Sequence, residues 1–327
     1  MNVLVTGGTG FLGSNLARSL LQRSDRVRVL GRNQHACDAL AAAGAEIARI
    51  DLRDGPGVMD ACVGMDVVCH AGAFSAPWGR QSDFLSINVG GTANVIAGCK
   101  AHGVSRLVYI SSPSVVFSGR DGAHMTESAP YPRRFASVYS ETKAMGERLV
   151  TRAFGEGLST VTLRPKAIFG PGDTSLLPRI LSAAAAGRLP QIGSGANRVD
   201  LTYVDNVVDA ILLAFLSDNA SGHTYTITNG EPVLLWNLIR EILGRLDYPS
   251  QLRTLPFPVV YGAAALMEGW AALTGREPLL TCYIVAILGR TQTYDITAAR
   301  RDLGYSPKVS LSEGVDRTLG ELKRNNG

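Results

Sequence analysis

Three glycines near the start of the chain, Gly7, Gly10 and Gly13, constrain the fold more than any other feature of the sequence. An apolar run over residues 3–5 precedes them, and leucines recur at helical spacing behind them. In a strand–turn–helix of this kind the first glycine permits the turn, the second lets N–H groups approach a pyrophosphate, and the third lets the helix lie close to the strand. We predict a dinucleotide-binding turn, with an ordinary glycine-rich turn as the alternative. Its residues are Thr6, Gly7, Gly8, Thr9, Gly10, Phe11, Leu12 and Gly13.

Strand and helix patterns alternate through the first half of the chain. The expected strands cover residues 3–5, 26–30, 46–50, 66–69, 107–110 and 160–163, and the longest expected helices cover residues 84–101 and 139–153. This alternation predicts an α/β fold, a Rossmann-type doubly wound parallel sheet with helices on both faces. Later segments are shorter and mixed, which indicates a smaller C-terminal substrate-binding lobe. We therefore expect a nucleotide-binding domain over residues 1–165 and mainly a substrate-binding lobe over residues 166–327, with some segments returning to the core.

Residues at the carboxyl ends of the strands should converge on one crevice, because open parallel sheets bind their ligands there. Besides the turn, the expected cofactor contacts are Arg32, Asp51, Leu52, Ala71, Gly72, Ala73, Tyr139, Lys143 and Pro165. Among these, Asp51 is a candidate partner for the exocyclic amine of the adenine ring.

The end of the second expected strand bears on the choice of cofactor. Enzymes that prefer NAD usually carry an acidic residue there to hold the ribose hydroxyls, whereas this chain has Gly31 followed by Arg32. A guanidinium pairs with a 2′-phosphate, which a carboxylate would repel. We therefore favour NADP(H). NAD(H) is the alternative, in which Arg32 is only a solvated surface residue.

Tyr139 and Lys143 lie four residues apart in an expected helix and therefore share one face. A tyrosine hydroxyl is a weak acid near neutral pH, and a neighbouring ammonium lowers its pKa by favouring the phenolate. Ser112, at the end of the fifth expected strand, is placed to hydrogen-bond a substrate carbonyl oxygen. The three residues predict proton delivery beside a hydride donor.

Charge and cysteine content argue against several other functions. The net charge of +4 is spread along the chain without a basic block, so no nucleic-acid partner is expected. The five cysteines lie far apart and form no CxxC pair, which favours a reduced, cytoplasmic protein without a disulfide framework or a metal site. The apolar stretch over residues 257–273 is interrupted by Pro258 and Glu268 and is short for a membrane span, so none is expected.

Taken together, these motifs resemble the extended short-chain dehydrogenase/reductase family over nearly the whole chain. The closer similarity is to its 3β-hydroxysteroid dehydrogenase branch and, among bacterial members, to the 2-alkyl-3-oxoalkanoate reductases of long-chain olefin biosynthesis. The matching segments are residues 6–13, 51–52, 88–92, 107–115, 139–143, 163–165, 169–173, 203–205, 227–232, 294–295 and 299–307. The resemblance implies catalytic roles for Ser112, Tyr139 and Lys143, and a supporting role for Asn88 at the active-site backbone. It also implies a homodimer through the two long helices.

One departure from the family narrows the reaction. Family members that dehydrate nucleotide sugars carry an Asp-Glu pair directly after the catalytic serine or threonine, where this chain has Pro113 and Ser114. Without those carboxylates, proton abstraction and loss of water lack their acid and base, so a dehydratase is not expected. A nucleotide-sugar 4-epimerase stays open. Its diphosphate-binding residues would be Arg179, Arg188 and Arg198.

We therefore predict an NADPH-dependent reductase, reversible as an alcohol dehydrogenase, that acts on a hydrophobic ketone such as a 2-alkyl-3-oxoalkanoate and forms the 3-hydroxy acid. The alternatives are a 3β-hydroxysteroid dehydrogenase, the 4-epimerase and a non-catalytic NADP(H)-sensing binding protein. Trp78, Ser114 and Lys166 are the candidate substrate contacts. Lys166 would pair with a substrate carboxylate or, alternatively, lie on the surface.

Overall fold

The structure is a computed structural model and describes residues 1–174 and 176–326. The strands of its central sheet are β1 (Asn2–Thr6), β2 (Arg26–Leu30), β3 (Glu46–Ala48), β4 (Val67–His70), β5 (Arg106–Ile110), β7 (Thr160–Pro165) and β12 (Thr224–Ile227). Within the described residues, these seven strands are parallel and lie in the order β12-β7-β5-β4-β1-β2-β3. The order reverses between β1 and β4. This boundary is therefore the switch point at which doubly wound sheets bind ligands.

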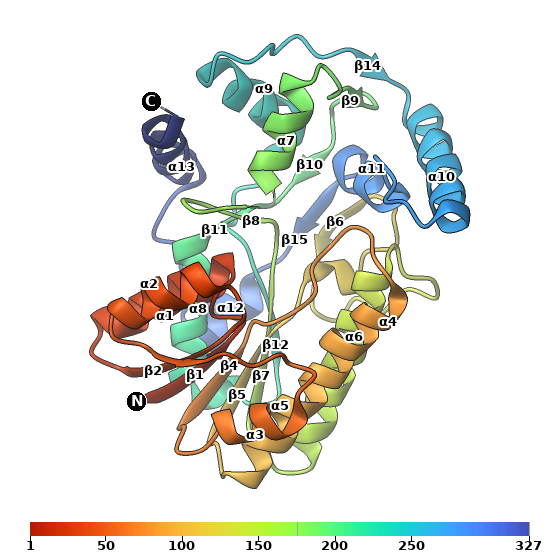
Figure 1. The fold of residues 1–327 in the computed structure, drawn as a ribbon. Helices are drawn as coiled ribbons and strands as arrows, with labels where there is room; N and C mark the ends of the chain where they lie inside the picture. The colour runs from red at the N-terminus through yellow and green to blue at the C-terminus, as the bar shows by residue number, and fades with distance from the viewer. Residues whose placement is uncertain (175, 327) are drawn as a thin grey trace.

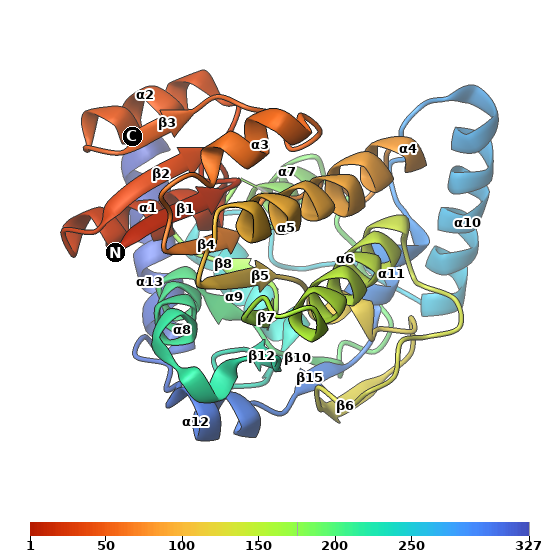
Figure 2. The same ribbon diagram turned by 90° about the horizontal axis from the view of Figure 1, so that it is seen from below.

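Helices cover both faces of the sheet. They include α1 (Phe11–Gln22), α2 (Gln34–Ala42), α3 (Gly55–Ala61), α5 (Gly91–Ala101), α6 (Val138–Gly155), α8 (Val204–Leu216), α12 (Thr297–Leu303) and α13 (Leu311–Asn326). Figures 1 and 2 show α1 and α8 on one face and α3, α5 and α6 on the other, in agreement with the contacts between these helices. The predicted doubly wound α/β fold is confirmed.

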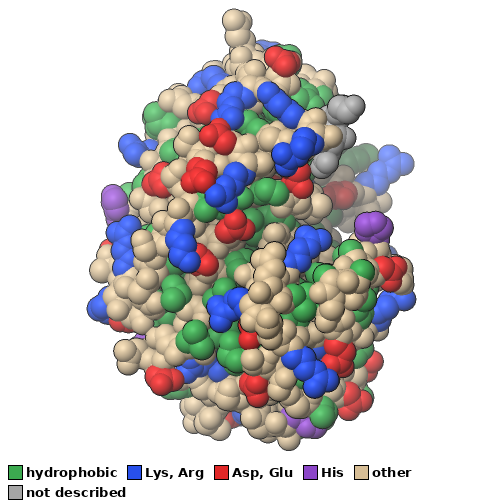
Figure 3. All heavy atoms as spheres, turned by 90° about the vertical axis from the view of Figure 1, so that its left-hand side faces the viewer, with side chains coloured by type: hydrophobic (Ala, Val, Ile, Leu, Met, Phe, Trp, Pro, Cys, Tyr) green, Lys and Arg blue, Asp and Glu red, His purple; other side chains and the backbone are tan. Residues whose placement is uncertain are grey.

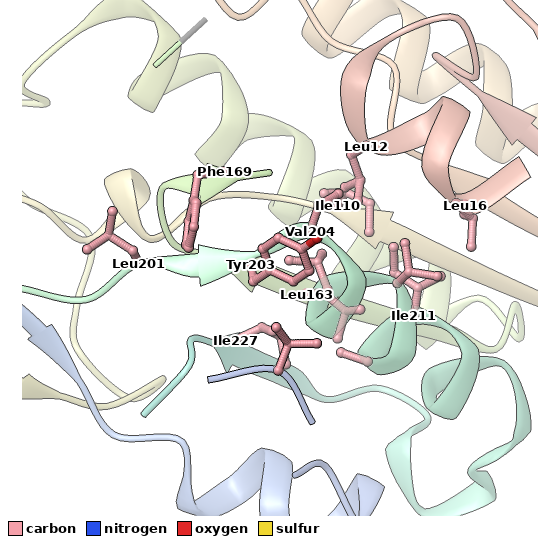
Figure 4. Packing of buried hydrophobic residues seen from close by; sticks show 14 of the residues in the cluster. Leu12, Leu16, Ile110, Leu163, Phe169, Leu201, Tyr203, Val204, Ile211 and Ile227 are labelled. Carbon is pink, nitrogen blue, oxygen red and sulfur yellow. The ribbon is translucent and has the colours of Figure 1, made fainter. Parts of the chain in front are cut away.

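The packing of α1 fixes the position of the glycine turn. Its leucines recur at helical spacing and form one apolar face, of which Leu12, Leu16 and Leu20 are buried. Figure 4 shows Leu12 and Leu16 in one cluster with Ile211 of α8 and Ile110 of β5. Because this cluster joins the helix to the sheet, the turn that precedes α1 cannot shift without disturbing the core.

The second half of the chain divides between the sheet and a smaller lobe, which lies above the sheet in Figure 1. The strand β12 pairs with β7 and so extends the central sheet. The lobe contains the strands β6 (Gly122–Met125), β8 (Ile168–Phe169), β9 (Gln191–Ile192), β10 (Arg198–Val199), β11 (Thr202–Tyr203), β13 (Val233–Leu234), β14 (Thr254–Leu255) and β15 (Gln292–Tyr294). Its helices are α7 (Leu176–Ala185), α9 (Leu235–Arg245), α10 (Phe257–Thr274) and α11 (Cys282–Gly289).

The single helix expected over residues 84–101 is interrupted in the structure. A short helix, α4 (Gln81–Phe84), passes into η1 (Leu85–Gly90), a π-helical segment, before α5 begins. The Thr92 hydroxyl donates to the Asn88 carbonyl at 2.6 Å, and such bonds to the carbonyl four residues back compete with the regular helical pattern. Segments of π-helix occur frequently at functional sites, and this one carries Asn88.

At the edge of the lobe, α10 leaves large apolar side chains exposed. Leu266, Trp270 and Leu273 are 78%, 67% and 84% exposed, and the buried residues of the helix are Val260, Ala264 and Ala271. Among the residues that the structure describes, no helix has the length and apolarity needed to span a membrane.

Charges of both signs are interspersed on the face that Figure 3 shows. Some of the exposed charges pair, as Arg317 does with Glu313 at 2.7 Å and Arg245 with Asp316 at 2.6 Å. Exposed pairs of this kind contribute at most about 1 kcal/mol each, so apolar burial between sheet and helices carries the stability of the fold.

Candidate active site

The glycine turn lies at the switch point between β1 and β4. Gly7 has a left-handed backbone with φ of 66°, and a Cβ there would lie 2.5 Å from the Cα of Gly72. A Cβ at Gly13 would lie 2.3 Å from the Gly7 carbonyl oxygen. Gly10 precedes α1 without a side-chain cap, which leaves the first N–H groups of the helix available to a ligand. The turn therefore fits a pyrophosphate held by backbone N–H groups.

Three charged residues form a cluster beyond the ends of β2 and β3. Arg32 Nη1 donates to Asp51 Oδ2 at 2.6 Å, and Arg53 donates to Asp51 from Nε at 2.9 Å and from Nη2 at 2.8 Å. Hydrogen bonding from Arg53, with a further contribution from Arg32, holds the pKa of Asp51 well below its usual range. Asp51, the candidate partner for an adenine amine, is thus bound by two guanidinium groups. Next to it, Leu52 is buried and would contact any side chain at Gly72.

A buried histidine connects the turn to α5. Thr6 Oγ1 lies 2.6 Å from Nδ1 of His70, and His70 Nε2 lies 3.0 Å from Oγ1 of Thr92. Burial, with the charge of Lys143 adding to it, lowers the pKa of His70 to about 3. His70 is therefore neutral at ordinary pH, and it joins structural elements rather than carrying protons.

Asn88 joins the loop after β4 to α6. Its Oδ1 accepts the N–H of Phe74 at 2.7 Å, and its Nδ2 donates to the Thr142 hydroxyl at 3.0 Å. The side chain is 1% exposed. Breaking either bond would leave a buried polar group without a partner, which is costly. Asn88 thus holds the loop after β4 against α6; its supporting role in catalysis stays a prediction.

The hydroxyls of Tyr139, Ser112 and Ser75 meet beyond β4 and β5. Ser112 follows β5, and its Oγ accepts the N–H of Ser114 at 3.2 Å. Burial raises the pKa of Tyr139, and hydrogen bonds from Ser75 and Ser112 lower it by less. The sequence predicted that the ammonium of Lys143 would lower the pKa of Tyr139. In the structure, Lys143 does not contribute to the pKa of Tyr139. The group is therefore a protonated phenol, suited to donating a proton.

Lys143 lies on the same face of α6 but is directed into the protein. Its Nζ donates to the Ile110 carbonyl at 2.7 Å and lies 4.0 Å from the centroid of the Tyr109 ring. The residue is 2% exposed. Burial lowers its pKa from 10.5 to about 7, although Glu147 acts in the opposite direction. A lysine with this pKa changes charge within the working pH range of most enzymes.

The low pKa of Lys143 predicts a pH-dependent stability. Between about pH 7 and pH 10 the unfolded chain holds the proton that the folded protein has released, so stability rises with pH by up to about 1.4 kcal/mol per pH unit. Lys143→Met removes this contribution. We expect the free energy of unfolding of the parent protein, relative to the variant, to increase from pH 7.5 to 9.5 in urea titrations. Lys323→Met, at an exposed position, is the control; equal pH slopes for the parent and Lys143→Met would contradict the prediction.

A cavity of about 570 Å³ opens beside Tyr139, a volume typical of small-molecule sites. It lies between the loop after β4, the segment before α6, and the lobe helices α10 and α11. The lining residues are Pro77, Trp78, Gly79, Phe84, Arg133, Arg134, Phe135, Ala136, Ser137, Val138, Tyr139, Glu141, Glu268 and Tyr283. The aromatic rings in the lining, among them Trp78, Phe84 and Phe135, suit a large substrate with apolar groups.

The three candidate substrate contacts lie in different places. Trp78 lines the cavity. Ser114 is buried near Tyr283, and its hydroxyl has no hydrogen-bond partner among the described residues. Lys166 is 9% exposed and is not one of the lining residues. Its Nζ donates to Gln292 Oε1 at 2.6 Å, so it is neither a surface residue nor directed at the cavity. The expected cofactor contacts lie at strand ends: Ala71, Gly72 and Ala73 follow β4, and Pro165 is the last residue of β7.

Several residues of the site were not expected from the sequence. Ser75 and Tyr283 are brought to Tyr139 by a loop and by α11, and nothing in their local sequence marks them. Arg133 and Arg134 were equally unmarked. Arg53 had a usable signal, because it lies two residues beyond Asp51 at a strand end, where basic residues face the cofactor ribose in a doubly wound sheet.

A doubly wound parallel sheet with a glycine turn at its switch point defines the class of dinucleotide-binding, Rossmann-type proteins. A model of the 3-beta hydroxysteroid dehydrogenase/isomerase family matches residues 4–259, and the chain belongs to this family. The resemblance noted in the sequence is therefore confirmed.

Two curated relatives are similar over nearly the whole chain. The 2-alkyl-3-oxoalkanoate reductase of Stenotrophomonas maltophilia (strain K279a) is 40% identical over 97% of this chain and 98% of its own length. The decarboxylating sterol-4-alpha-carboxylate 3-dehydrogenase of Mus musculus is 34% identical over 96% of this chain and 89% of its own. Both names describe oxidoreductases, in agreement with the predicted class of enzyme.

Among solved structures, the UDP-glucuronic acid 4-epimerase from Bacillus cereus, in complex with NAD, aligns over 100% of both chains with a TM-score of 0.77. Its sequence is 22% identical. At this identity the likeness shows the fold alone and says nothing of the substrate of this chain.

Proposed function

We propose that this protein is an NADPH-dependent reductase that converts hydrophobic 3-oxo acids to 3-hydroxy acids and runs in reverse as an alcohol dehydrogenase. The observation that supports this most is the Tyr139 hydroxyl, which lies near Ser112 and Ser75 on the wall of a cavity lined by aromatic rings. A bound NADPH supplies the hydride. Ser112 orients the ketone oxygen, and Tyr139 donates the proton as charge develops on that oxygen. The raised pKa of Tyr139 keeps it in the donating form.

The substrate class rests on what the relatives' names have in common. In a 2-alkyl-3-oxoalkanoate, the carboxylate is attached to the carbon next to the ketone. In a sterol 4α-carboxylate oxidised at carbon 3, the carboxylate is again attached to the neighbouring carbon. The two names thus describe one reacting unit, a 3-oxygenated carboxylic acid that carries bulky apolar groups. The aromatic lining of the cavity, with Trp78, Phe84 and Phe135, suits such groups.

The preference for NADPH rests on the cluster beyond β2 and β3. Arg32 and Arg53 already gather around Asp51 and neutralise its charge. A 2′-phosphate placed there would meet two guanidinium groups, which bind phosphate more strongly than ribose hydroxyls. NADH has no group that would use them.

Removing the two guanidinium groups should change the cofactor preference. We expect Arg32→Ala/Arg53→Ala to raise KM for NADPH by about 10- to 100-fold, because charge-assisted hydrogen bonds to the 2′-phosphate are lost. KM for NADH should change by less than about threefold. Steady-state kinetics with both cofactors measure this. Arg26→Ala, at an exposed arginine on the other end of β2, should change neither. An equal rise for both cofactors would contradict the preference.

One assay compares the candidate functions. Purified protein is mixed with NADPH and, in parallel, with a long-chain 2-alkyl-3-oxo acid, a 3-ketosteroid and a UDP-sugar. We expect oxidation of NADPH with the oxo acid. Oxidation with the ketosteroid alone would favour the second candidate, a sterol dehydrogenase, which the murine relative supports.

Interconversion of the UDP-sugar without net oxidation would replace the proposal by an epimerase. The arginines expected for that reaction, Arg179, Arg188 and Arg198, do not line the cavity. Arg198 donates to the Pro232 carbonyl at 2.8 Å.

A further inference from the structure

The wall of the cavity beside Tyr139 carries two adjacent cations. Arg133 and Arg134 precede α6, line the cavity and are exposed. In the described part of the chain, neither guanidinium has an ion-pair or hydrogen-bond partner. Both groups are therefore free to bind an anion that enters the cavity.

The end of α6 adds to the positive potential at this wall. The N-cap Ser137 and the first two residues of this 18-residue helix, Val138 and Tyr139, also line the cavity. The amino end of a helix carries a partial positive charge that favours a nearby anion.

Two carboxylates, those of Glu141 and Glu268, also line the cavity, and they differ in how they are held. Glu268 Oε1 accepts the N–H of Cys282 at 2.9 Å, at the amino end of α11. Glu141 lies exposed in the first turn of α6. Hence Glu268 is held against the lobe, and Glu141 is the remaining carboxylate near the arginines.

Lys166, the residue that the sequence suggested for a substrate carboxylate, is bound to Gln292. The cations that do face the cavity are those of the segment before α6. Arginine suits the task, because its planar guanidinium binds a carboxylate through two parallel hydrogen bonds.

We propose that Arg133 and Arg134 bind the carboxylate of the substrate and make the enzyme prefer 3-oxo and 3-hydroxy acids over neutral ketones and alcohols of the same shape. The proposal rests on the reductase function given above. The carboxylate lies one carbon from the reacting carbon, so holding it also fixes that carbon beside Tyr139. The aromatic residues of the cavity would then hold the apolar chains.

The test compares an acid with its methyl ester, which keeps the reacting carbon and the chains but removes the charge. A 2-alkyl-3-hydroxy acid and its ester are stable, so oxidation with NADP⁺ is measured for both. We expect the parent protein to prefer the acid. Arg133→Gln/Arg134→Gln should lower kcat/KM for the acid by about 10- to 100-fold and change it for the ester by less than about threefold, since a charge-assisted pair is lost only with the acid.

Two further variants test whether the preference for the acid depends on cations that line the cavity or on any cation near it. Arg80→Gln removes an exposed cation next to the lining segment 77–79 without altering the lining itself, and it should leave the preference unchanged. Arg133→Lys/Arg134→Lys should restore part of the activity toward the acid.

The outcomes distinguish this proposal from the function on which it rests. An unchanged preference for the acid in the double glutamine variant, or an equal loss with acid and ester, would overturn the role of the arginines and leave the reductase intact. If the parent protein oxidised neither compound and reduced no 3-oxo acid, the reductase function itself would be overturned.

Discussion

Tyr139→Phe is expected to reduce kcat for ketone reduction by about a thousandfold, the contribution of a positioned proton donor. The substitution removes one hydroxyl and keeps the ring, so the cavity wall keeps its shape. Binding of NADPH, followed by its fluorescence, should change by less than about twofold. Rapid single-turnover kinetics would locate the loss in the chemical step.

The neighbouring tyrosine of the cavity provides a matched control. Tyr283 of α11 lines the same cavity as Tyr139, near Ser114 and Ser140. Tyr283→Phe removes the same kind of hydroxyl from the cavity, and we expect a loss of less than about tenfold. Full activity in Tyr139→Phe would contradict the proposed chemistry and restore the alternative of a non-catalytic binding protein.

Arg164→Met is expected to destabilise the protein by about 3–5 kcal/mol, the typical cost of leaving a buried charge without its partner. Arg164 and Glu147 are 5% and 2% exposed and pair through two hydrogen bonds of 2.8 and 2.7 Å. The Tyr131 hydroxyl adds a third bond to Glu147 at 2.6 Å. The pair joins β7 to α6, one helical turn beyond Lys143. Urea unfolding at pH 7 measures the loss.

A second variant tests whether the unpaired charge is the cause. In Glu147→Leu/Arg164→Met both charges are replaced by apolar groups, and more than half of the lost stability should return. A double variant as unstable as the sum of the two single variants would show that packing, and not the charge left behind, sets the cost.

Much of the fold could be predicted from local patterns. The strands β1, β4 and β5 contain short apolar runs typical of buried parallel strands, and β2 alternates Arg26 and Arg28 with the buried Val27 and Val29. The glycine turn could be predicted because Gly7, Gly10 and Gly13 lie between an apolar run and a helical pattern. The structure gives the physical reason for the glycines, since a Cβ at Gly7 or Gly13 would clash with backbone atoms. The π-helical segment η1 could not be predicted, because no residue pattern over 85–90 marks it and its residue Asn88 is fixed by distant contacts to Phe74 and Thr142.

The candidate site also has a part that local patterns predict and a part that they do not. Tyr139 and Lys143 share a helix face, so their relation is local, and Ser112 follows a strand whose end must face the crevice. The pKa of Tyr139 went against the local expectation, since the ammonium of Lys143 is directed at Ile110 and burial dominates. Spacing shows which side chains share a face, but not where a long side chain ends.

The sequence by itself therefore determined the doubly wound sheet and the turn at its switch point, because the strand, turn and helix patterns are local. It also predicted Ser112, Tyr139 and Lys143 as the catalytic set, which stays a prediction. Only the tertiary structure decided which distant residues complete the cavity. It brought Tyr283 and Glu268 from the C-terminal lobe to the wall beside Tyr139, and it turned Lys166 away toward Gln292. These contacts arise from packing between segments more than a hundred residues apart, and no local pattern records them.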